Sequence, residues 1–522
     1  MSATEPASPW KRAQRPGTPS QTGSPTVSPD SELSVPTSFG GPQYSTDVTT
    51  VSARKYCIVL VGLPARGKTF LAHKLCRLLG WLGHSAKVYN VQRVWRELLH
   101  GNDGVLNSRE PSDAVSVPKP QPHEPSTTSP RFTDYDFSNN SRTKAQYIEA
   151  LTRCRDRVAH FFDEKGLVAF INDDFCDPQL RELTENMLQP VCDEIIYFEV
   201  IRDEARAFDD LKVQSKTEYY GDLSPEEAKK DFAARVAMLK EVYQTVGDDK
   251  RYIKVRNGKH IEIHKVHGYI PSRMVSFLMN LSQQKMSYPI YFSRHGQTTY
   301  NVEDRIGGNP VLTEKGHEDA LALKEFIAAV KEECDEQSLG RAKPVELQIW
   351  TSQLTRTLQT AKPAEDALGI KGLRWSALNE IHAGVCEELT YADVKKEFPL
   401  IHDFRKKHKY SFRYPQGESY QDLVARLEPI IMELENANCV VVVIAHQAVL
   451  RGLLAYFNEA SAQSSVEFEV PHRTVWRCTS SSTGISMLEE VHLDEWSANR
   501  RRRMDSSERL QDDAVAQASC ES

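Results

Sequence analysis

Long apolar runs and clustered cysteines are both missing from this sequence. The longest wholly apolar stretch is Cys439–Ala445, whereas a membrane-spanning helix needs about 20 such residues. The start of the chain lacks the apolar core of a secretory signal. The ten cysteines are scattered, without a Cys-x-x-Cys pair or a Cys/His cluster. We therefore expect a cytoplasmic protein with no membrane partner, no zinc site and no disulfide framework.

An excess of positive charge is missing as well. The 522 residues include 65 Lys and Arg against 72 Asp and Glu, a net charge of −7. This balance argues against a general nucleic-acid-binding protein, so we expect no nucleic-acid partner. Hydrophobic residues make up 40 % of the chain, which is enough to build buried cores. At about 100–200 residues per domain, the length predicts two folded domains plus tails.

Composition marks three segments that we expect to be disordered. The first is a tail at residues 1–52, whose first 50 residues include 25 Ser, Thr or Pro. It is either passive or, through pairs such as Ser8-Pro9, a substrate of proline-directed protein kinases. Residues 101–130, with 13 Ser, Thr or Pro, look like an insertion in a surface loop. Residues 495–522 form a polar C-terminal tail, in which arginines 500–503 precede Ser506, another candidate phosphorylation site.

Alternating strand and helix patterns predict an α/β fold for both domains, which we place at residues 53–286 and 287–494. In the first domain we expect strands at 56–61, 87–91, 167–171, 194–200 and 251–255, and helices at 68–79, 143–164 and 273–281. This order indicates a mostly parallel sheet covered on both faces. In the second domain we expect strands at 288–293, 347–350 and 440–445, and helices at 314–333, 355–368 and 420–435.

A phosphate-binding loop follows the first predicted strand. The pattern G-x-x-x-x-G-K-[ST] is matched by Gly62, Leu63, Pro64, Ala65, Arg66, Gly67, Lys68 and Thr69. Glycines in this pattern let backbone N–H groups approach phosphate oxygens at a helix N-terminus. Lys68 is expected to meet the β- and γ-phosphates and Thr69 to ligate Mg²⁺, so ATP with Mg²⁺ is the predicted ligand. Asp173 and Asp174 follow a buried strand and are either metal carboxylates or solvated loop acids.

The second domain carries two histidines at the ends of predicted strands, where open α/β sheets form active sites. Arg294 and His295 follow one strand and His446 follows another, while Arg356 and Glu380 come after a third. A neutral imidazole can attack phosphorus and form a phosphohistidine. Arginines would spread the charge on the phosphoryl oxygens and lower the pKa of the histidine. A carboxylic acid such as Glu380 could protonate the leaving oxygen and later activate water.

These residues resemble the histidine phosphatase superfamily, which includes the phosphoglycerate mutases. Together with the phosphate loop, the chain resembles the 6-phosphofructo-2-kinase/fructose-2,6-bisphosphatase family over about residues 55–490. The resembling stretches are 62–69, 294–301, 305–308, 350–357, 378–388, 414–422 and 446–451. The resemblance implies a phosphate-loop nucleotide-binding domain followed by a phosphoglycerate-mutase-like α/β domain, with no cofactor in the latter.

The resemblance also implies roles for individual residues of the second domain. His295 would be the nucleophile and Glu380 the proton donor. The 2-phosphate would be held by Arg294, Asn301, Arg356 and His446. Gly307 would line the sugar pocket. The 6-phosphate end would be held by Tyr391, Arg405, Lys409, Tyr420, Gln447 and Arg451. For Arg405 and Lys409 the sequence leaves a second interpretation, a solvated helix face, because Lys406, Lys407 and His408 lie between them.

The kinase-like domain departs from the family pattern. The family has an aspartate after the Val-Phe of its second buried strand, then Ala-Thr-Asn, whereas Phe170 is followed here by Ile171, Asn172, Asp173 and Asp174. A fructose 6-phosphate arginine has no counterpart near Ser138, and a tyrosine is replaced by Leu239. Lys212 and Arg235, which the resemblance implies belong to the kinase site, are retained. The chain is therefore predicted to work mainly as a fructose-2,6-bisphosphatase with a weak or absent kinase.

Other functions remain open at this point. The alternatives are a fully bifunctional kinase/phosphatase and a nucleotide-binding regulator without turnover. A phosphoglycerate mutase fits poorly, since it would not need the phosphate-loop domain. Predicted partners are the small molecules fructose 2,6-bisphosphate, fructose 6-phosphate and ATP, with a homodimer and regulatory protein kinases as further candidates.

Overall fold

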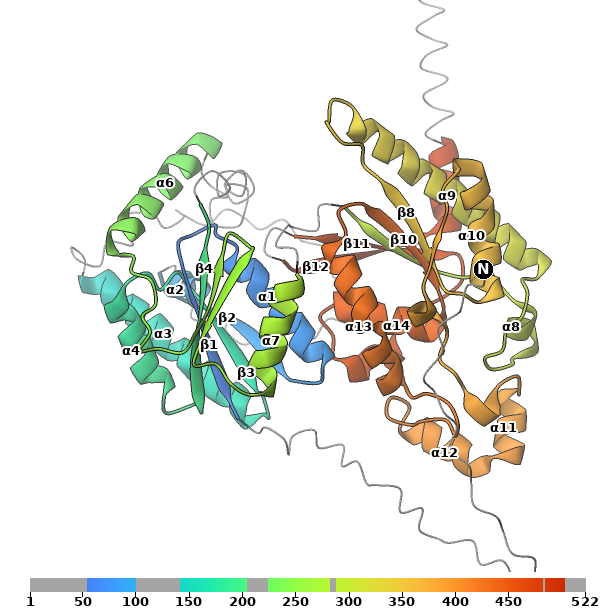
Figure 1. Cartoon of the computed structure of the whole chain (residues 1–522), viewed down its shortest axis with the longest axis horizontal. Helices are drawn as coiled ribbons and strands as arrows, with labels where there is room; N and C mark the ends of the chain where they lie inside the picture. The colour runs from blue at the N-terminus through green and yellow to red at the C-terminus, as the bar shows by residue number, and fades with distance from the viewer. Residues whose placement is uncertain (1–53, 100–140, 204–223, 282–287, 482–483, 503–522) are drawn as a thin grey trace, which may run out of the picture. The chain divides into compact units, whose positions relative to one another are not determined.

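The computed structural model describes residues 54–99, 141–203, 224–281, 288–481 and 484–502. The predicted tail at 1–52, the insertion at 101–130, Ser138, Lys212 and Ser506 lie outside these described residues. Within them the structure has two six-stranded sheets, each with helices on both faces (Figure 1). None of the helices in these ranges combines the length and apolar character that crossing a membrane requires.

The first sheet has the strand order β2-β3-β1-β4-β5-β6. Its strands are β1 (Tyr56–Val61), β2 (Ala86–Asn90), β3 (Val168–Asn172), β4 (Glu194–Ile201), β5 (Tyr252–Arg256) and β6 (His260–His264). All neighbours are parallel except β5 and β6. Its helices are α1 (Lys68–Trp81), α2 (Val91–Leu99), α3 (Ser141–Asp163), α4 (Pro178–Leu188), α6 (Pro225–Val242) and α7 (Tyr269–Asn280).

The central strand β1 explains why helices cover both faces of this sheet. All six of its side chains are buried, and successive side chains on a strand point to opposite faces. Tyr56, Ile58 and Leu60 share a core with α1 and α7. The alternate residues, Cys57 and Val59 among them, share a second core with α2 and α3 (Figure 1). The continuous apolar run therefore gives a central strand of a mostly parallel sheet, as predicted.

The second sheet has the order β12-β11-β7-β10-β8-β9. Its strands are β7 (Ile290–Arg294), β8 (Leu347–Thr351), β9 (Leu373–Arg374), β10 (Val440–Ala445), β11 (Thr474–Ser480) and β12 (Ser486–His492). Its helices are α8 (Thr299–Glu303), α9 (Glu314–Ser338), α10 (Thr355–Leu368), α11 (Tyr391–Glu397), α12 (Pro399–Lys407), α13 (Tyr420–Asn436) and α14 (Gln447–Phe457), and short 3₁₀ turns lie at Ser376–Leu378, Gly384–Cys386 and Ala462–Glu467.

Strand β10 lies inside this sheet and is parallel to both β7 and β8. Val441 and Val443 pack in a core with α13 and α14. Val440, Val442 and Ile444 pack in the opposite core with α9 and α10. The predicted strand 440–445 and helix 355–368 have these bounds in the structure. Helices α4, α6 and α14 and the antiparallel pair of β11 and β12 were not predicted from the sequence.

The C-terminal end differs from the expectation that the chain becomes an irregular tail after Asp494. Residues 493–502 are helical. Leu493 is buried, and Trp496 packs edge-to-face on Phe326 of α9 at 5.1 Å between ring centroids. Arg500 pairs with Glu332 at 2.6 Å. The prediction was wrong here because Leu493, Trp496 and Arg500 follow helical spacing, which the surrounding polar residues obscured.

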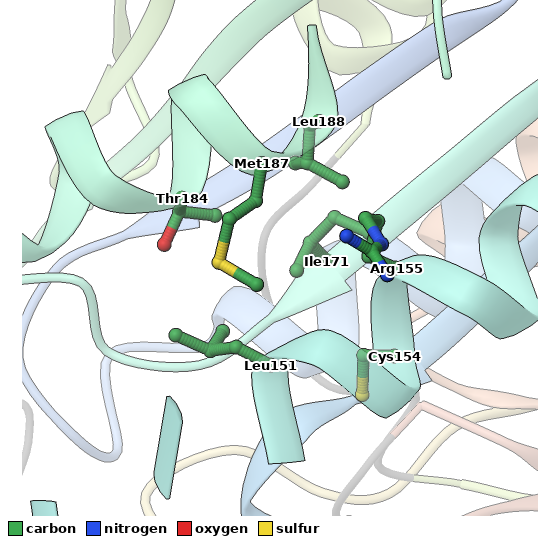
Figure 2. Close-up of a pocket in the computed structure, with 7 residues that line it drawn as sticks. All are labelled: Leu151, Cys154, Arg155, Ile171, Thr184, Met187 and Leu188. Carbon is green, nitrogen blue, oxygen red and sulfur yellow. The ribbon is translucent and has the colours of Figure 1, made fainter. Parts of the chain in front are cut away.

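A small pocket lies between α3, α4 and β3 (Figure 2). It is lined by Leu151, Cys154, Arg155, Ile171, Thr184, Met187 and Leu188. Most of these side chains are apolar and belong to the core on that face of the sheet. None of the predicted catalytic or phosphate-binding residues lines it, so we interpret it as a gap in packing.

Trp496→Ala is expected to loosen the helix at 493–502. Loss of about 1.4 kcal/mol of packing on Phe326 makes local opening about tenfold more frequent. Hydrogen–deuterium exchange of peptides covering 495–502 should rise by that factor, while peptides from β10 keep their protection. Glu495→Ala, at an exposed neighbouring position, is the control and should leave exchange unchanged. Equal exchange in both variants would contradict the assignment of Trp496 as the anchor.

Candidate active sites

The two predicted catalytic histidines lie next to each other at one edge of the second sheet. β7 ends at Arg294 and β10 at Ala445, and these two residues are paired in the parallel register. His295 and His446 follow directly, with their ring centroids 5.2 Å apart. Parallel strands that end together place the next residues side by side. The sequence prediction for both positions agrees with this geometry.

The ring of His295 is oriented with one nitrogen available for reaction. Its Nδ1 lies 2.8 Å from the carbonyl oxygen of Gly296, and since a carbonyl only accepts, Nδ1 carries the proton. Nε2 therefore keeps its lone pair. Burial, followed by the positive charges of Arg356 and Arg294, holds the pKa of His295 well below its ordinary value. The side chain is thus a neutral imidazole at neutral pH, the form that can act as a nucleophile.

His446 is held by Arg356 and Ser352. Arg356 Nε donates to His446 Nδ1 at 3.0 Å, so the proton of this ring is on Nε2, which lies 2.8 Å from Ser352 Oγ. Burial and the charge of Arg356 lower the pKa of His446 well below its ordinary value. Its Nε2–H can donate only to a hydroxyl or an incoming oxygen. This arrangement makes His446 a neutral hydrogen-bond donor beside the nucleophile.

Arg294 and Glu380 lie at the same edge. Arg294 Nη1 donates to the carbonyl of Val470 at 3.1 Å, while its buried Nε has no hydrogen-bond partner among the described residues. Glu380 accepts from the N–H of Ile381 at 3.0 Å and lies 3.4 Å from the N–H of Ala448 in α14. Burial lowers the pKa of Arg294 and the charge of Glu380 opposes this effect. The site therefore combines a guanidinium with a vacant donor and one nearby carboxylate.

Asn301 and Gly307 belong to the loop that follows His295. Asn301 Oδ1 accepts from both the N–H and the hydroxyl of Thr298, each at 2.9 Å, in the capping box of α8. Gly307 has φ 65°, and a Cβ on it would lie 2.0 Å from Glu387 Oε2. Glycine is required there because both the backbone angle and the space exclude a side chain. The neighbouring Gly308 carbonyl accepts from Arg356 Nη1 at 2.9 Å, which ties this loop to the site.

A second group of cations contains Arg405, Lys409 and Arg451. Arg405 lies over the ring of Tyr391 at 5.0 Å, and Arg451 Nη1 donates to the Tyr420 hydroxyl at 3.2 Å. Burial, together with the charges of Arg451 and Arg405, lowers the pKa of Lys409. The three cations are therefore close enough to affect one another. The remaining predicted residue, Gln447, is half-buried and begins α14 directly after His446.

Exposure distinguishes the two interpretations of Arg405 and Lys409. Lys406, Lys407 and His408 are exposed, whereas Arg405 and Lys409 are half-buried. Lys409 also donates to the carbonyl of Val466 at 3.2 Å. On a solvated helix face, all five side chains from 405 to 409 would be exposed. The difference in exposure therefore favours the interpretation that Arg405 and Lys409 face inward.

None of the cations of the two groups forms an ion pair with a carboxylate in the described part of the chain. This holds for Arg294, Arg356, Arg405, Lys409 and Arg451. Their hydrogen-bond partners are carbonyl oxygens, tyrosine hydroxyls and an imidazole nitrogen. Buried cations without a counter-ion are costly, and an anionic ligand would remove that cost. The arrangement is suited to a molecule with two separated phosphates.

Three supporting residues were not identified from the sequence. Ser352 bonds to His446, Glu387 accepts the N–H groups of Ala383 and Gly308, and His472 Nδ1 donates to the backbone oxygen of His295 at 2.9 Å. Ser352 directly follows β8, which was an available signal. Glu387 lies in a loop and His472 precedes the β11–β12 hairpin. No local sequence pattern predicts that these two segments reach the site.

The phosphate loop of the first sheet joins β1 to α1. Gly62 and Gly67 have positive φ angles of 135° and 91°, and a Cβ on Gly62 would lie 2.5 Å from the carbonyl oxygen of Val200. Lys68 Nζ donates to the carbonyls of Gly62 at 2.7 Å and Leu63 at 2.8 Å. The loop therefore wraps around the lysine at the N-terminus of a helix, the arrangement that binds phosphates.

Asp173 and Asp174 are buried, 7 % and 8 % exposed, so the interpretation as solvated loop acids is wrong. Asp173 accepts from Tyr147 and from Gln92. Asp174 forms ion pairs with Lys68 at 2.9 Å and Arg235 at 2.6 Å.

The pKa values of the two carboxyls are shifted in opposite directions. Burial and the charge of Asp174 raise the pKa of Asp173. Burial also acts against ionisation of Asp174, but Lys68 and Arg235 outweigh it, and the pKa of Asp174 lies below its ordinary value. The two ion pairs of Asp174 therefore favour its ionised form.

Asn172 is the polar residue that faces Thr69. The Thr69 hydroxyl lies 3.2 Å from Asn172 Oδ1 and 3.0 Å from Nδ2. Mg²⁺ bound with a nucleotide takes oxygen ligands, commonly one or two carboxylates plus phosphates. Here the nearest oxygens are a hydroxyl and an amide, and both aspartates already bind protein donors. The residues fit a metal held by Thr69 and by the phosphates of the nucleotide itself.

Two sequence models of known families match this chain. The model described as 6-phosphofructo-2-kinase matches residues 44–285, and the model described as histidine phosphatase superfamily (branch 1) matches residues 290–490. The chain therefore contains both domains.

Proteins similar to this chain have names that combine the two activities, 6-phosphofructo-2-kinase and fructose-2,6-bisphosphatase. The chain is 34 % identical to 6-phosphofructo-2-kinase/fructose-2,6-bisphosphatase 3 of Rattus norvegicus, over 87 % of this chain and 75 % of that protein. It is 35 % identical to the Homo sapiens protein of that name, over 84 % and 76 %. It is 36 % identical to 6-phosphofructo-2-kinase/fructose-2,6-bisphosphatase of Caenorhabditis elegans, over 81 % and 86 %. The chain belongs to the bifunctional 6-phosphofructo-2-kinase/fructose-2,6-bisphosphatase family.

Proposed function

We propose that the C-terminal half hydrolyses fructose 2,6-bisphosphate to fructose 6-phosphate and phosphate through a phosphohistidine on His295. The observation that carries this proposal is the set of five cations without carboxylate partners around a neutral imidazole. Arg294 and Arg356 would bind the reacting 2-phosphate, together with Asn301 and His446. Arg405, Lys409 and Arg451 would bind the 6-phosphate, with Tyr391, Tyr420 and Gln447 beside them and Gly307 next to the sugar.

The reaction would proceed in two displacements at phosphorus. His295 Nε2 forms a bond to the 2-phosphoryl phosphorus while the bond from phosphorus to the C2 oxygen breaks. Glu380 gives a proton to that oxygen, and fructose 6-phosphate leaves. Glu380, now a carboxylate, takes a proton from water as its oxygen attacks the phosphohistidine, which releases phosphate and neutral His295. The arginines and His446 would stabilise the charge on the equatorial oxygens in both steps.

We further propose that the N-terminal half binds ATP with Mg²⁺ and transfers phosphate to fructose 6-phosphate slowly. Lys68 and the loop amides would hold the nucleotide phosphates, and Thr69 would contribute an oxygen to the metal. The weak transfer is inferred from Asn172 at the metal position and from half-buried Leu239, one helical turn after Arg235 in α6. The fully bifunctional alternative is favoured by the intact phosphate loop alone.

Several narrower expectations stay predictions. Domain boundaries at 53–286 and 287–494, a homodimer and phosphorylation of the tails belong to this group. A cytoplasmic location is supported by the nine described cysteines, all of which are free.

His295→Ala is expected to abolish the covalent phosphoprotein and nearly all hydrolysis of fructose 2,6-bisphosphate, because it removes the proposed nucleophile, and the unprotonated nitrogen of the adjacent His446 is bonded to Arg356. Rapid quench in alkali with 2-³²P-labelled substrate, followed by gel analysis at alkaline pH, measures both quantities, because a phosphohistidine is hydrolysed in acid. His408→Ala, at an exposed histidine, is the matched control and should retain the phosphoprotein. A labelled phosphoprotein in His295→Ala would contradict the mechanism.

Arg405→Ala and Lys409→Ala are expected to raise KM about ten- to a hundredfold, with much smaller changes in kcat. The reason is that the non-reacting phosphate is bound alike in the ground state and the transition state, and a charge-assisted bond contributes about 1.5–3 kcal/mol. Steady-state kinetics with fructose 2,6-bisphosphate test this. Lys406→Ala, on the same helix but exposed, is the control. If all three variants had the wild-type KM, the pair would lie on a solvated face.

The N-terminal half is expected to bind ATP but to form fructose 2,6-bisphosphate more slowly than the about 10 per second of an ordinary enzyme. Equilibrium dialysis with ATP and Mg²⁺ gives the affinity, and synthesis is followed in His295→Ala so that product is not hydrolysed. Lys68→Met should abolish nucleotide binding. Synthesis at an ordinary rate would instead establish a fully bifunctional enzyme.

A further inference from the structure

Asp174 joins Lys68 of the phosphate loop to Arg235 of α6. Its Oδ1 lies 2.9 Å from Lys68 Nζ, the phosphate-loop lysine, and its Oδ2 lies 2.6 Å from Arg235 Nη2 on α6. All three side chains are buried, with exposed fractions of 5 %, 6 % and 8 % for Lys68, Arg235 and Asp174. The two cations therefore share one carboxylate inside the N-terminal site.

The lysine has no donor to spare for a phosphate. An ammonium carries three N–H groups, and those of Lys68 are directed at the carbonyls of Gly62 and Leu63 and at Asp174. A phosphate can bind Lys68 only by displacing one of these acceptors. Displacing Asp174 breaks a charge-assisted bond and leaves a carboxylate next to the negative phosphate, which is unfavourable.

Hydrogen bonds also hold the backbone and the carboxylate of Asp174 in place. The N–H of Gly62, the first residue of the phosphate loop, donates to the carbonyl of Asp174 at 2.9 Å. Gln92 Nε2 lies 3.3 Å from Asp174 Oδ2. The residue is thus fixed beside the loop that receives the nucleotide.

We propose that Asp174 competes with phosphate groups for Lys68 and Arg235, and so lowers the affinity of the N-terminal site for nucleotide and for a phosphorylated acceptor. This inference depends on the proposed nucleotide binding and adds an internal competitor to it. Asp173, the adjacent carboxyl, takes no part, because its partners are the neutral donors Tyr147 and Gln92.

The test measures binding of ATP with Mg²⁺, and of inorganic pyrophosphate, to the full chain by isothermal titration calorimetry without acceptor sugar. Asp174→Asn keeps the shape of the side chain and removes its charge, and it should lower both dissociation constants about tenfold or more. Asp173→Asn makes the same replacement one residue away, at a carboxyl whose partners are Tyr147 and Gln92, and should change them about twofold at most. Lys68→Met identifies the signal that comes from this site.

A second comparison covers the case in which Asp174→Asn is too unstable, since it leaves two buried cations unbalanced. The double variant Asp174→Asn/Arg235→Gln restores the charge balance and should bind ATP more tightly than Arg235→Gln alone. Equal tightening by Asp173→Asn and Asp174→Asn, or weaker binding in Asp174→Asn, would overturn the competition. Absence of binding sensitive to Lys68→Met in every variant would instead overturn the proposed nucleotide site.

Discussion

A set of cations that form no ion pair with a carboxylate in the described part of the chain is the constraint on which the C-terminal site depends. Arg294 and Arg356 are held by carbonyls and an imidazole, and Arg405 and Arg451 by carbonyls, aromatic rings and hydroxyls. These partners fix the position of each guanidinium without reducing its charge. A structure built in this way is stabilised by an anion, because the ligand supplies the counter-charge that the chain withholds.

Burial and the same cations determine the protonation state of His295. Burial and the arginines lower the pKa of His295 and of His446, and both rings have one nitrogen bonded to a fixed partner. A protonated His295 could not attack phosphorus, so burial and the cations proposed to bind the substrate together keep the proposed nucleophile in its reactive form. In the proposed reaction, binding and activation therefore come from one arrangement of charges rather than from two.

The sequence was sufficient to predict most of this arrangement, because the residues concerned directly follow apolar strands. Arg294, His295 and His446 could be placed at one sheet edge from the strand pattern alone. For Arg405 and Lys409 the sequence could not exclude a solvated face. The distinction depends on which side of α12, and of the turn that follows it, packs against the rest of the domain. Ser352, Glu387 and His472 act through contacts between segments far apart in the chain, which no local pattern encodes. The helix at 493–502 was missed because Leu493, Trp496 and Arg500, which contact the rest of the domain, are separated by polar residues.

The cations proposed to bind phosphate have different partners in the two halves. In the C-terminal half the cations lack carboxylate partners in the described residues, whereas in the N-terminal half Lys68 and Arg235 share the carboxylate of Asp174. An ion pair that is already formed must be broken before a phosphate can replace it, so the same ligand charge yields less binding free energy. The chain retains a phosphate loop of ordinary shape, with its glycines at positive φ. The difference between the halves therefore lies in the charged partners of their cations rather than in the geometry of the loop.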